Sequence, residues 1–229
     1  MEENLGNKRQ KNERLDTKMT RKKLRLRRLI IFFGCVGCGK GAAGKELRRT
    51  YNQLVIGQSD LLRFYSGYFP NSPEAHDFLS AGDQGNYASD ETALSTFEYF
   101  LPTFLHGHET AFGDGLCRTP PQFEALLNLA VKHEFLLCGA FINLHEDECR
   151  KRILTFRKAQ ENRADDNPET LETRLKLYHE KTLPVIRKAR EIFGEDFLEV
   201  PGILEPAQKA DLIARHFKLE KHHPATNCS

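Results

Sequence analysis

The segment at residues 34–40 constrains the fold of this chain most. It reads Gly-Cys-Val-Gly-Cys-Gly-Lys and matches the pattern G-x-x-x-x-G-K. The wholly apolar run 29–33 precedes it, as expected for a strand buried on both faces of a parallel sheet. An amphipathic stretch, 42–51, follows it. A glycine-rich turn between a buried strand and a helix predicts a phosphate-binding loop, because inward-facing N–H groups and the helix N-terminus both attract anions.

The rest of the chain alternates between short apolar runs and longer amphipathic segments. The apolar runs predict strands at 54–56, 110–112, 135–143 and 197–200. The amphipathic segments predict helices at 60–65, 73–80, 90–105, 121–132, 146–157, 168–193 and 207–217. Pro184 is expected to kink or break the long helix at 168–193. This alternation of strands and helices predicts an α/β fold with a parallel sheet.

The two ends of the chain differ from the part between them. Residues 1–28 carry eleven Lys and Arg against four Asp and Glu, whereas the rest carries 28 acidic against 23 basic side chains. We expect a basic, disordered tail at 1–28, with a helical turn near 19–28 as an option. A disordered tail is also expected at 221–229, which leaves one domain at 29–220. The basic tail is either a solvated extension or a weak contact site for RNA or another polyanion.

The cysteines and the hydropathy favour a cytoplasmic protein without a membrane anchor. Six cysteines at positions 35, 38, 117, 138, 149 and 228 show no disulfide framework, which favours a reducing compartment. The apolar run 29–33 is far shorter than the roughly 20 residues of a membrane helix, and no signal-peptide pattern precedes it. We interpret Cys35 and Cys38 as small residues filling the loop, with redox inhibition as the weaker alternative.

Residues 34–43 resemble the phosphate loop of the adenylate kinase family, G-x-P-G-x-G-K-G-T-Q, with Val36, Ala42 and Ala43 as the departures. In that family the threonine at the position of Ala42 supplies a hydroxyl among the phosphate and Mg²⁺ ligands, which Ala42 lacks. Lys40 would follow the transferring phosphoryl group. The resemblance implies an ATP site made of Gly34, Gly37, Cys38, Gly39, Lys40, Gly41, Ala42, Arg157 and Gly202.

Two further segments resemble the acceptor side of the same family. Residues 57–63 are similar to S-T-G-D-x-x-R, and residues 113–122 are similar to D-G-F-P-R-T-x-x-Q. By this resemblance Arg63 and Arg118 would hold the acceptor phosphate, and Gln122 would read the adenine edge. Asp114 would organise Mg²⁺ through water, with Asp60 as a second candidate. The implied AMP site comprises Gln58, Arg63, Gly115, Arg118, Gln122, Arg163 and Arg174.

A third segment, 163–170, resembles R-x-D-D-N-x-E-T, with Arg174 following at the family's spacing. Arg163 and Arg174 would point at the phosphates. Arg157 is our choice for the arginine that precedes the lid in this family. The lid itself, about 156–165, is short and contains no cysteine, so the chain resembles the short-lid members and no zinc is expected.

Taken together, the resemblance runs from about residue 28 to residue 217 and implies a P-loop NTPase fold. A small helical insertion at about 57–88 would bind the nucleoside monophosphate. The implied reaction is ATP + AMP to 2 ADP with Mg²⁺ in a monomeric enzyme, with Lys40, Arg118, Arg157, Arg163 and Arg174 as catalytic residues. One alternative is a UMP/CMP-type kinase. The other is a catalytically weakened nucleotide-binding or regulatory protein, which the substitutions at Ala42, Ala43, Gln58 and Phe156 motivate.

Overall fold

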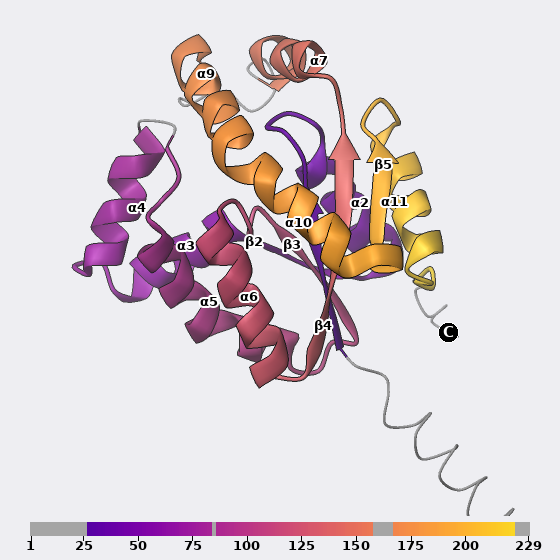
Figure 1. Ribbon diagram of the computed structural model, residues 1–229, viewed down its shortest axis with the longest axis horizontal. Coiled ribbons are helices and arrows are strands. Elements are labelled where there is room, and N and C mark those ends of the chain that lie inside the picture. Colours follow the sequence, from indigo (N-terminus) through magenta and orange to yellow (C-terminus); the bar gives the residue numbers. More distant parts are fainter. Residues whose placement is uncertain (1–26, 84–85, 158–166, 223–229) are drawn as a thin grey trace, which may run out of the picture.

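The sheet places the glycine-rich loop at the centre of the molecule. The computed structural model describes residues 27–83, 86–157 and 167–222 (Figure 1). Five parallel strands form one sheet in the order β2-β3-β1-β4-β5. They are β1 (Arg27–Phe33), β2 (Leu54–Gly57), β3 (Thr110–Asp114), β4 (Phe135–Asn143) and β5 (Phe197–Pro201). The strand order reverses at β1, and ligands of such sheets bind where this happens, outside the carboxyl ends of the strands.

Helices connect the strands, as the sequence predicts. They are α2 (Lys40–Tyr51), α3 (Gln58–Tyr68), α4 (Pro73–Asp83), α5 (Asp90–Leu105), α6 (Pro120–Lys132), α7 (Glu146–Lys151), α9 (Pro168–Leu177), α10 (Leu183–Phe193) and α11 (Pro206–His216). Two π-helical turns, Arg152–Arg157 and Tyr178–Thr182, continue α7 and α9. The second turn leads directly into Pro184 at the start of α10, which confirms the expected break. The α/β fold with a parallel sheet is confirmed.

The apolar run of β1 packs on both faces of the sheet. Leu29, Ile31 and Phe33 join a cluster with α5, α6 and α10 on one face. Ile30 and Phe32 join a second cluster with α2 and α11 on the other face. All five side chains are almost completely buried. This burial on two sides explains why the run contains no polar residue, and it holds the loop that follows in a fixed place.

The boundaries of the expected tails need correction. β1 begins at Arg27, so the option of a helical turn near 19–28 is wrong for its last two residues, and the remainder lies outside the described residues. The Arg28 guanidinium donates to the Phe217 carbonyl oxygen at 3.1 Å. This hydrogen bond joins the start of β1 to the end of α11. At the other end, the His222 N–H donates to the Thr50 carbonyl oxygen at 3.0 Å, so the domain extends past residue 220.

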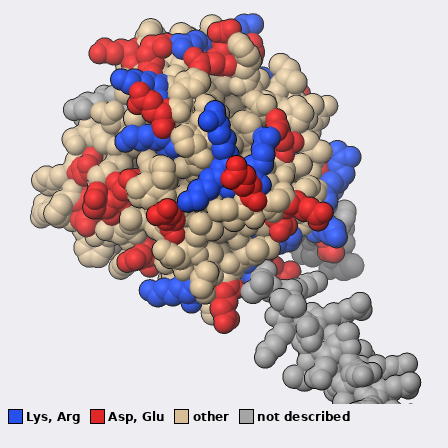
Figure 2. Space-filling model, in the orientation of Figure 1, with Lys and Arg blue, Asp and Glu red and all other residues tan. Residues whose placement is uncertain are grey.

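One face of the described part is mixed in charge. On the face seen in Figure 2, basic and acidic side chains are interspersed rather than gathered into areas of one sign. Across the described residues, no helix is both long and apolar enough to span a bilayer.

Candidate functional site

The loop after β1 has a backbone that only glycine adopts easily. The φ angles are 138° at Gly34, 83° at Gly37 and 100° at Gly39. Side-chain-bearing residues rarely adopt such angles. A Cβ would also lie 2.6 Å from the Ile142 carbonyl oxygen at Gly34, and 2.9 Å from the Cys149 carbonyl oxygen at Gly37. Both the backbone conformation and the lack of space therefore require the glycines that the sequence pattern contains.

Lys40 is folded back over this loop. Its Nζ donates to the carbonyl oxygens of Gly34 at 2.7 Å and Cys35 at 2.9 Å. Burial alone would lower the pKa of the Lys40 ammonium, but Cys38 and Asp114 act in the opposite direction and the pKa is raised overall. Lys40 therefore keeps its charge at neutral pH and can exchange its carbonyl partners for phosphate oxygens.

Asp114 brings a carboxylate to the same place. It ends β3, opposite Phe32 of β1, and a Cβ at Gly41 would lie 3.7 Å from its Oδ2 atom. The part of the chain that the structure describes holds no group of three or more His, Cys, Asp or Glu side chains that could enclose a metal ion. A single carboxylate beside a phosphate loop suits Mg²⁺, which keeps several waters and takes its other ligands from substrate phosphates. The residues present thus fit Mg²⁺ with Asp114 as the protein's contribution.

Two arginines expected to bind an acceptor phosphate are held in different ways. Arg63 lies on α3 with its side chain 65% exposed and pairs with Asp60 at 3.0 Å. Arg118 follows β3, and its Nε donates to the Gly115 carbonyl oxygen at 3.1 Å. The Arg118 guanidinium also lies over the Tyr87 ring, 4.8 Å from its centroid. The Arg118 side chain is thus held in place by Gly115 and Tyr87, whereas the Arg63 side chain is exposed at the surface.

The side chain of Gln122 hydrogen-bonds to the backbone of Arg118. This side chain is completely buried. Its Oε1 accepts from the Arg118 N–H at 2.9 Å, and its Nε2 donates to Asp90 Oδ1 at 3.0 Å. The Thr119 hydroxyl donates to the same Asp90 oxygen at 2.6 Å. The proposed role of Gln122 in reading a base edge stays a prediction, and such a contact would require the Asp90 bond to be exchanged.

Gln58, another residue of the expected acceptor site, has an unsatisfied polar atom. It opens α3 directly after β2, and it is almost completely buried. Its Oε1 has no hydrogen-bond partner among the described residues. A buried acceptor without a donor costs free energy, so a ligand that donates a hydrogen bond here would remove that cost.

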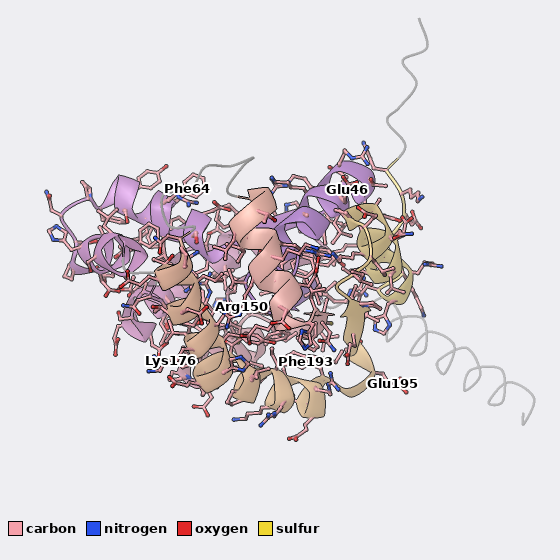
Figure 3. The ribbon with its side chains drawn as sticks, turned by 90° about the horizontal axis from the view of Figure 1, so that it is seen from above. Glu46, Phe64, Arg150, Lys176, Phe193 and Glu195 are labelled. Atoms are coloured by element: carbon pink, nitrogen blue, oxygen red, sulfur yellow. The ribbon has the colours of Figure 1, made fainter. Side chains whose placement is uncertain are left out.

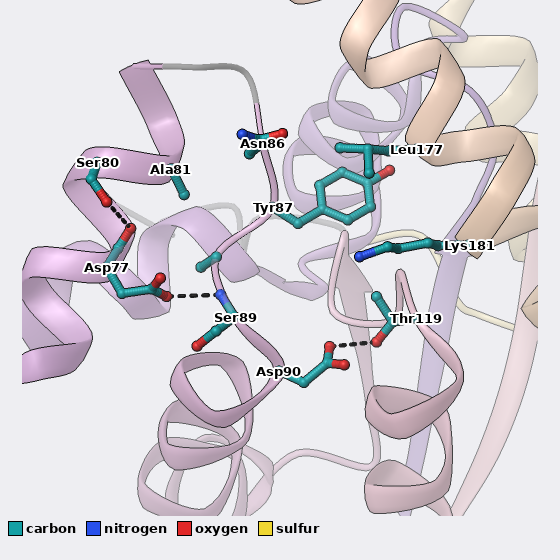
Figure 4. Close-up of a pocket in the computed structure, with 11 residues that line it drawn as sticks. Asp77, Ser80, Ala81, Asn86, Tyr87, Ser89, Asp90, Thr119, Leu177 and Lys181 are labelled. Atoms are coloured by element: carbon teal, nitrogen blue, oxygen red, sulfur yellow. Dashed lines mark hydrogen bonds between the residues drawn. The ribbon is translucent and has the colours of Figure 1, made fainter.

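A cavity of about 330 Å³ lies between α4, the start of α6 and the turn after α9 (Figure 4). Asp77 shapes it by accepting from the Ser89 N–H at 2.7 Å. Tyr87 and Lys181 also line it, and Tyr87 connects it to Arg118. Its volume is at the lower end of the range for small-molecule sites. The full lining is Asp77, Ser80, Ala81, Asn86, Tyr87, Ala88, Ser89, Asp90, Thr119, Leu177 and Lys181.

The expected lid is described only at its borders. Arg163 lies outside the described residues, and so does the side chain of Arg157. Arg174 is half-buried on α9. The roles assigned to these three arginines stay predictions.

A charge network that the sequence analysis missed links α7 to α9 and the turn after it. Arg150, labelled in Figure 3, pairs with Glu146 at 2.5 Å and with Glu172 of α9. His179 Nε2 lies 2.5 Å from the second oxygen of Glu146. The hydrogen bonds from His179 and then Arg150 lower the pKa of Glu146. The i,i+4 spacing of Glu146 and Arg150 was the only signal of this network in the sequence.

Two more basic residues near the loop were also missed. Arg152 donates to the carbonyl oxygen of Gly202 at 3.1 Å, and the Gly202 N–H donates to the Asn143 carbonyl oxygen at 2.7 Å. Lys209 on α11 is buried beside Gly39. It shares a helix face with Ile213, four residues later, which is buried against the sheet. A lysine on the apolar stripe of a helix is the signal that could have revealed it.

The chain is similar in sequence to several adenylate kinases. It is 32% identical over 162 residues to an adenylate kinase of Bacteroides thetaiotaomicron, which covers 69% of this chain and 82% of the relative. It is 32% identical over 181 residues to an adenylate kinase of Leptospira biflexa, covering 76% and 88%. For an adenylate kinase of Thermus thermophilus the identity is 31% over 159 residues, covering 69% and 80%. No family model matches the chain.

Proposed function

Because the chain belongs to the adenylate kinase family and is a nucleoside monophosphate kinase, we propose that it transfers a phosphoryl group reversibly from ATP to AMP, with Mg²⁺. The observation that carries this proposal is that Lys40 and Arg118 follow the carboxyl ends of two neighbouring strands. Lys40 follows β1 and Arg118 follows β3, and the positive charge of Arg118 acts to lower the pKa of Lys40. Two phosphates held by these two residues would face each other.

The chemistry asks for positioning and charge rather than a general base, because the acceptor is already an anionic phosphate. Lys40 would leave its two carbonyl partners and hold an oxygen of the transferring group. Arg118 would hold the acceptor phosphate with its planar guanidinium, which suits bidentate contact better than an ammonium. Bound Mg²⁺, oriented by Asp114, would neutralise charge on the phosphate oxygens.

The environment of Gln58 favours an acceptor nucleotide whose base carries an amino group. Its buried Oε1 lacks a donor, and the amino groups of adenine and cytosine can supply one. Uracil carries a carbonyl oxygen where cytosine carries its amino group, so its ring N3–H would have to donate instead. This favours AMP over UMP and leaves CMP as the second candidate.

An acceptor screen tests this proposal. Full-length protein, ATP and Mg²⁺ would be mixed with AMP, CMP or UMP, and ADP formation followed. We expect AMP to give the highest kcat/KM and UMP roughly tenfold less or lower, since an unsatisfied buried polar group is worth about 1–3 kcal/mol. Gln58→Met keeps the side-chain length, removes the acceptor and should narrow the difference between AMP and UMP. Equal or faster phosphorylation of UMP by the wild-type protein would refute the choice of AMP.

Three accompanying properties are also proposals. The chain would act as a monomer, it would work in the cytoplasm, and its basic N-terminal residues would make at most a weak contact with a polyanion. Sedimentation of the full chain with and without RNA tests the first and the third, and a stable dimer or tight RNA binding would contradict them.

A further inference from the structure

Lys209 approaches the phosphate loop from an element far away in the sequence. It lies in the first turn of α11, which packs beside α2 on one face of the sheet. The residue is 2% exposed, which places it among the largest fully buried side chains of the described part. Its Nζ lies 2.9 Å from the position that a Cβ on Gly39 would occupy. The lysine therefore contacts the loop where Gly39 lacks a side chain.

Among the described residues, the Lys209 ammonium has no counterion. No hydrogen bond or ion pair joins it to another described residue, and only longer-range charges act on it. Burial lowers the pKa of Lys209, and the nearby Arg152 lowers it further, while Cys38 and Glu205 act weakly in the opposite direction. Lysines are almost never fully buried unless they are paired, because an unpaired buried charge costs free energy.

Lys209 differs in this respect from Lys40. The Lys40 ammonium already has two carbonyl partners in the loop. The three N–H donors of Lys209 have no partner in the part of the chain that the structure describes, and the positive charge of Arg152 also acts on this ammonium. A site with this excess of positive charge, lined by a loop of backbone N–H groups, fits a polyanion better than any neutral ligand.

We propose that Lys209 binds a phosphate oxygen of the donor nucleotide in the loop at residues 34–40, as a second ammonium beside Lys40. The inference rests on the proposed function, since it assumes a nucleoside triphosphate in that loop. The proposed role of Lys209 also agrees with the side chains in the first turn of α2. Ala42 lies there, and its methyl group cannot donate a hydrogen bond to a phosphate. Lys209 supplies a donor at the loop from another helix.

Two consequences follow for the protein without nucleotide. Replacing Lys209 by methionine removes a buried, unpaired charge and keeps most of the side-chain volume, so the ligand-free protein should be as stable as the wild type or more stable. The same replacement should reduce the stabilisation that ATP provides, because that stabilisation depends on affinity.

The test measures binding by calorimetry with the full chain. ATP, inorganic tripolyphosphate and AMP serve as separate probes, and Lys209→Met is compared with Lys188→Met. Lys188 is a suitable control because it lies on α10, is half exposed and, among the described residues, pairs only with Glu124. We expect Lys209→Met to bind ATP and tripolyphosphate about ten- to a hundredfold more weakly, the effect of one charge-assisted hydrogen bond. AMP affinity should not change, and Lys188→Met should match the wild type.

Each other outcome overturns the proposal. Lys209→Met with wild-type affinity for ATP and tripolyphosphate would refute it while leaving the kinase function intact. An equal loss for AMP would assign Lys209 to the shape of the whole site rather than to the donor phosphates. A wild-type protein that binds neither ATP nor tripolyphosphate would remove the proposed function and this inference together. If Lys209→Met does not fold, Lys209→Gln, which is also neutral, gives the same comparison.

Discussion

The two regions that we propose to bind nucleotides are built in opposite ways. The donor loop, residues 34–40, continues the buried central strand and lies between the sheet, α2 and α11. The acceptor arm, which we define as residues 57–83, stands at the periphery with α3 and α4. Arg63 is 65% exposed there, and Phe64 of the same helix is 55% exposed (Figure 3).

This difference in burial predicts which properties a substitution in each region will change. The donor loop shares its contacts with the core, so substitutions there change stability and nucleotide binding together. The acceptor arm carries its charged groups in solvent, so substitutions of these groups should change acceptor binding alone. In order of decreasing effect, substitutions at Lys40, at Gly39 and Gly67, and at Arg63 compare the two regions, and a substitution at Glu146 of α7 tests a site outside both.

Lys40→Met should have the largest effect on activity. It removes the ammonium at the donor loop, and the loss of one donor aimed at developing charge typically lowers kcat about a hundred- to a thousandfold. Steady-state ADP formation measures this. Lys45→Met, at an exposed position of the same helix, is the control and should leave kcat unchanged. A loss of less than fivefold for Lys40→Met, roughly 1 kcal/mol, would mean that the loop is not the donor site.

Two glycine substitutions compare the donor loop with the acceptor arm through the free energy of unfolding. Gly39→Ala should destabilise the protein by about 1–3 kcal/mol, because φ is 100° there, an angle that residues with a side chain rarely adopt. Gly67→Ala, in the helix α3 with open space around it, should stabilise by about 0.4–1 kcal/mol. Urea unfolding measures both. If both substitutions shifted stability in the same direction, the contrast between loop and arm would not hold.

Arg63→Ala should change acceptor binding without changing stability. The lost charge-assisted hydrogen bond predicts a KM for AMP about tenfold higher, with the KM for ATP unchanged. The exposed pair with Asp60 contributes little, so the free energy of unfolding should stay within about 0.5 kcal/mol. An equal rise in both KM values would show that Arg63 serves the donor as well.

Glu146→Gln should give the smallest effect, visible in the pH dependence of stability. Hydrogen bonds from His179 and Arg150 hold the pKa of Glu146 below its ordinary value of 4.5 in the folded protein. A lowered folded-state pKa means that the carboxylate stabilises the fold above pH 4.5 and loses this contribution as the pH falls through its folded-state pKa. Unfolding free energies of wild type and variant should therefore differ at pH 7 and converge in acid. A difference that does not depend on pH would contradict this.

The sequence could predict the parts that depend on local pattern. The run 29–33 and the glycines after it determined the central strand and the loop, because burial and backbone geometry act on neighbouring residues. The break at Pro184 was predictable for the same reason. Lys209 and Tyr87 were not, because each acts through packing between segments distant in the chain. For Gln122 the sequence motif predicted a site residue. It did not predict the hydrogen bonds of Gln122 to Arg118 and Asp90, because these depend on the three-dimensional arrangement of the chain.

The most direct test of the whole account is the stoichiometry of transfer. Purified full-length protein would be incubated with ATP, AMP and Mg²⁺, and all nucleotides quantified over time by chromatography. The account predicts that two ADP appear for each ATP and each AMP consumed, and that the reverse reaction converts ADP to ATP and AMP. Binding of ATP without any transfer to AMP would contradict the proposal, and the site would then hold a nucleotide without using it in this reaction.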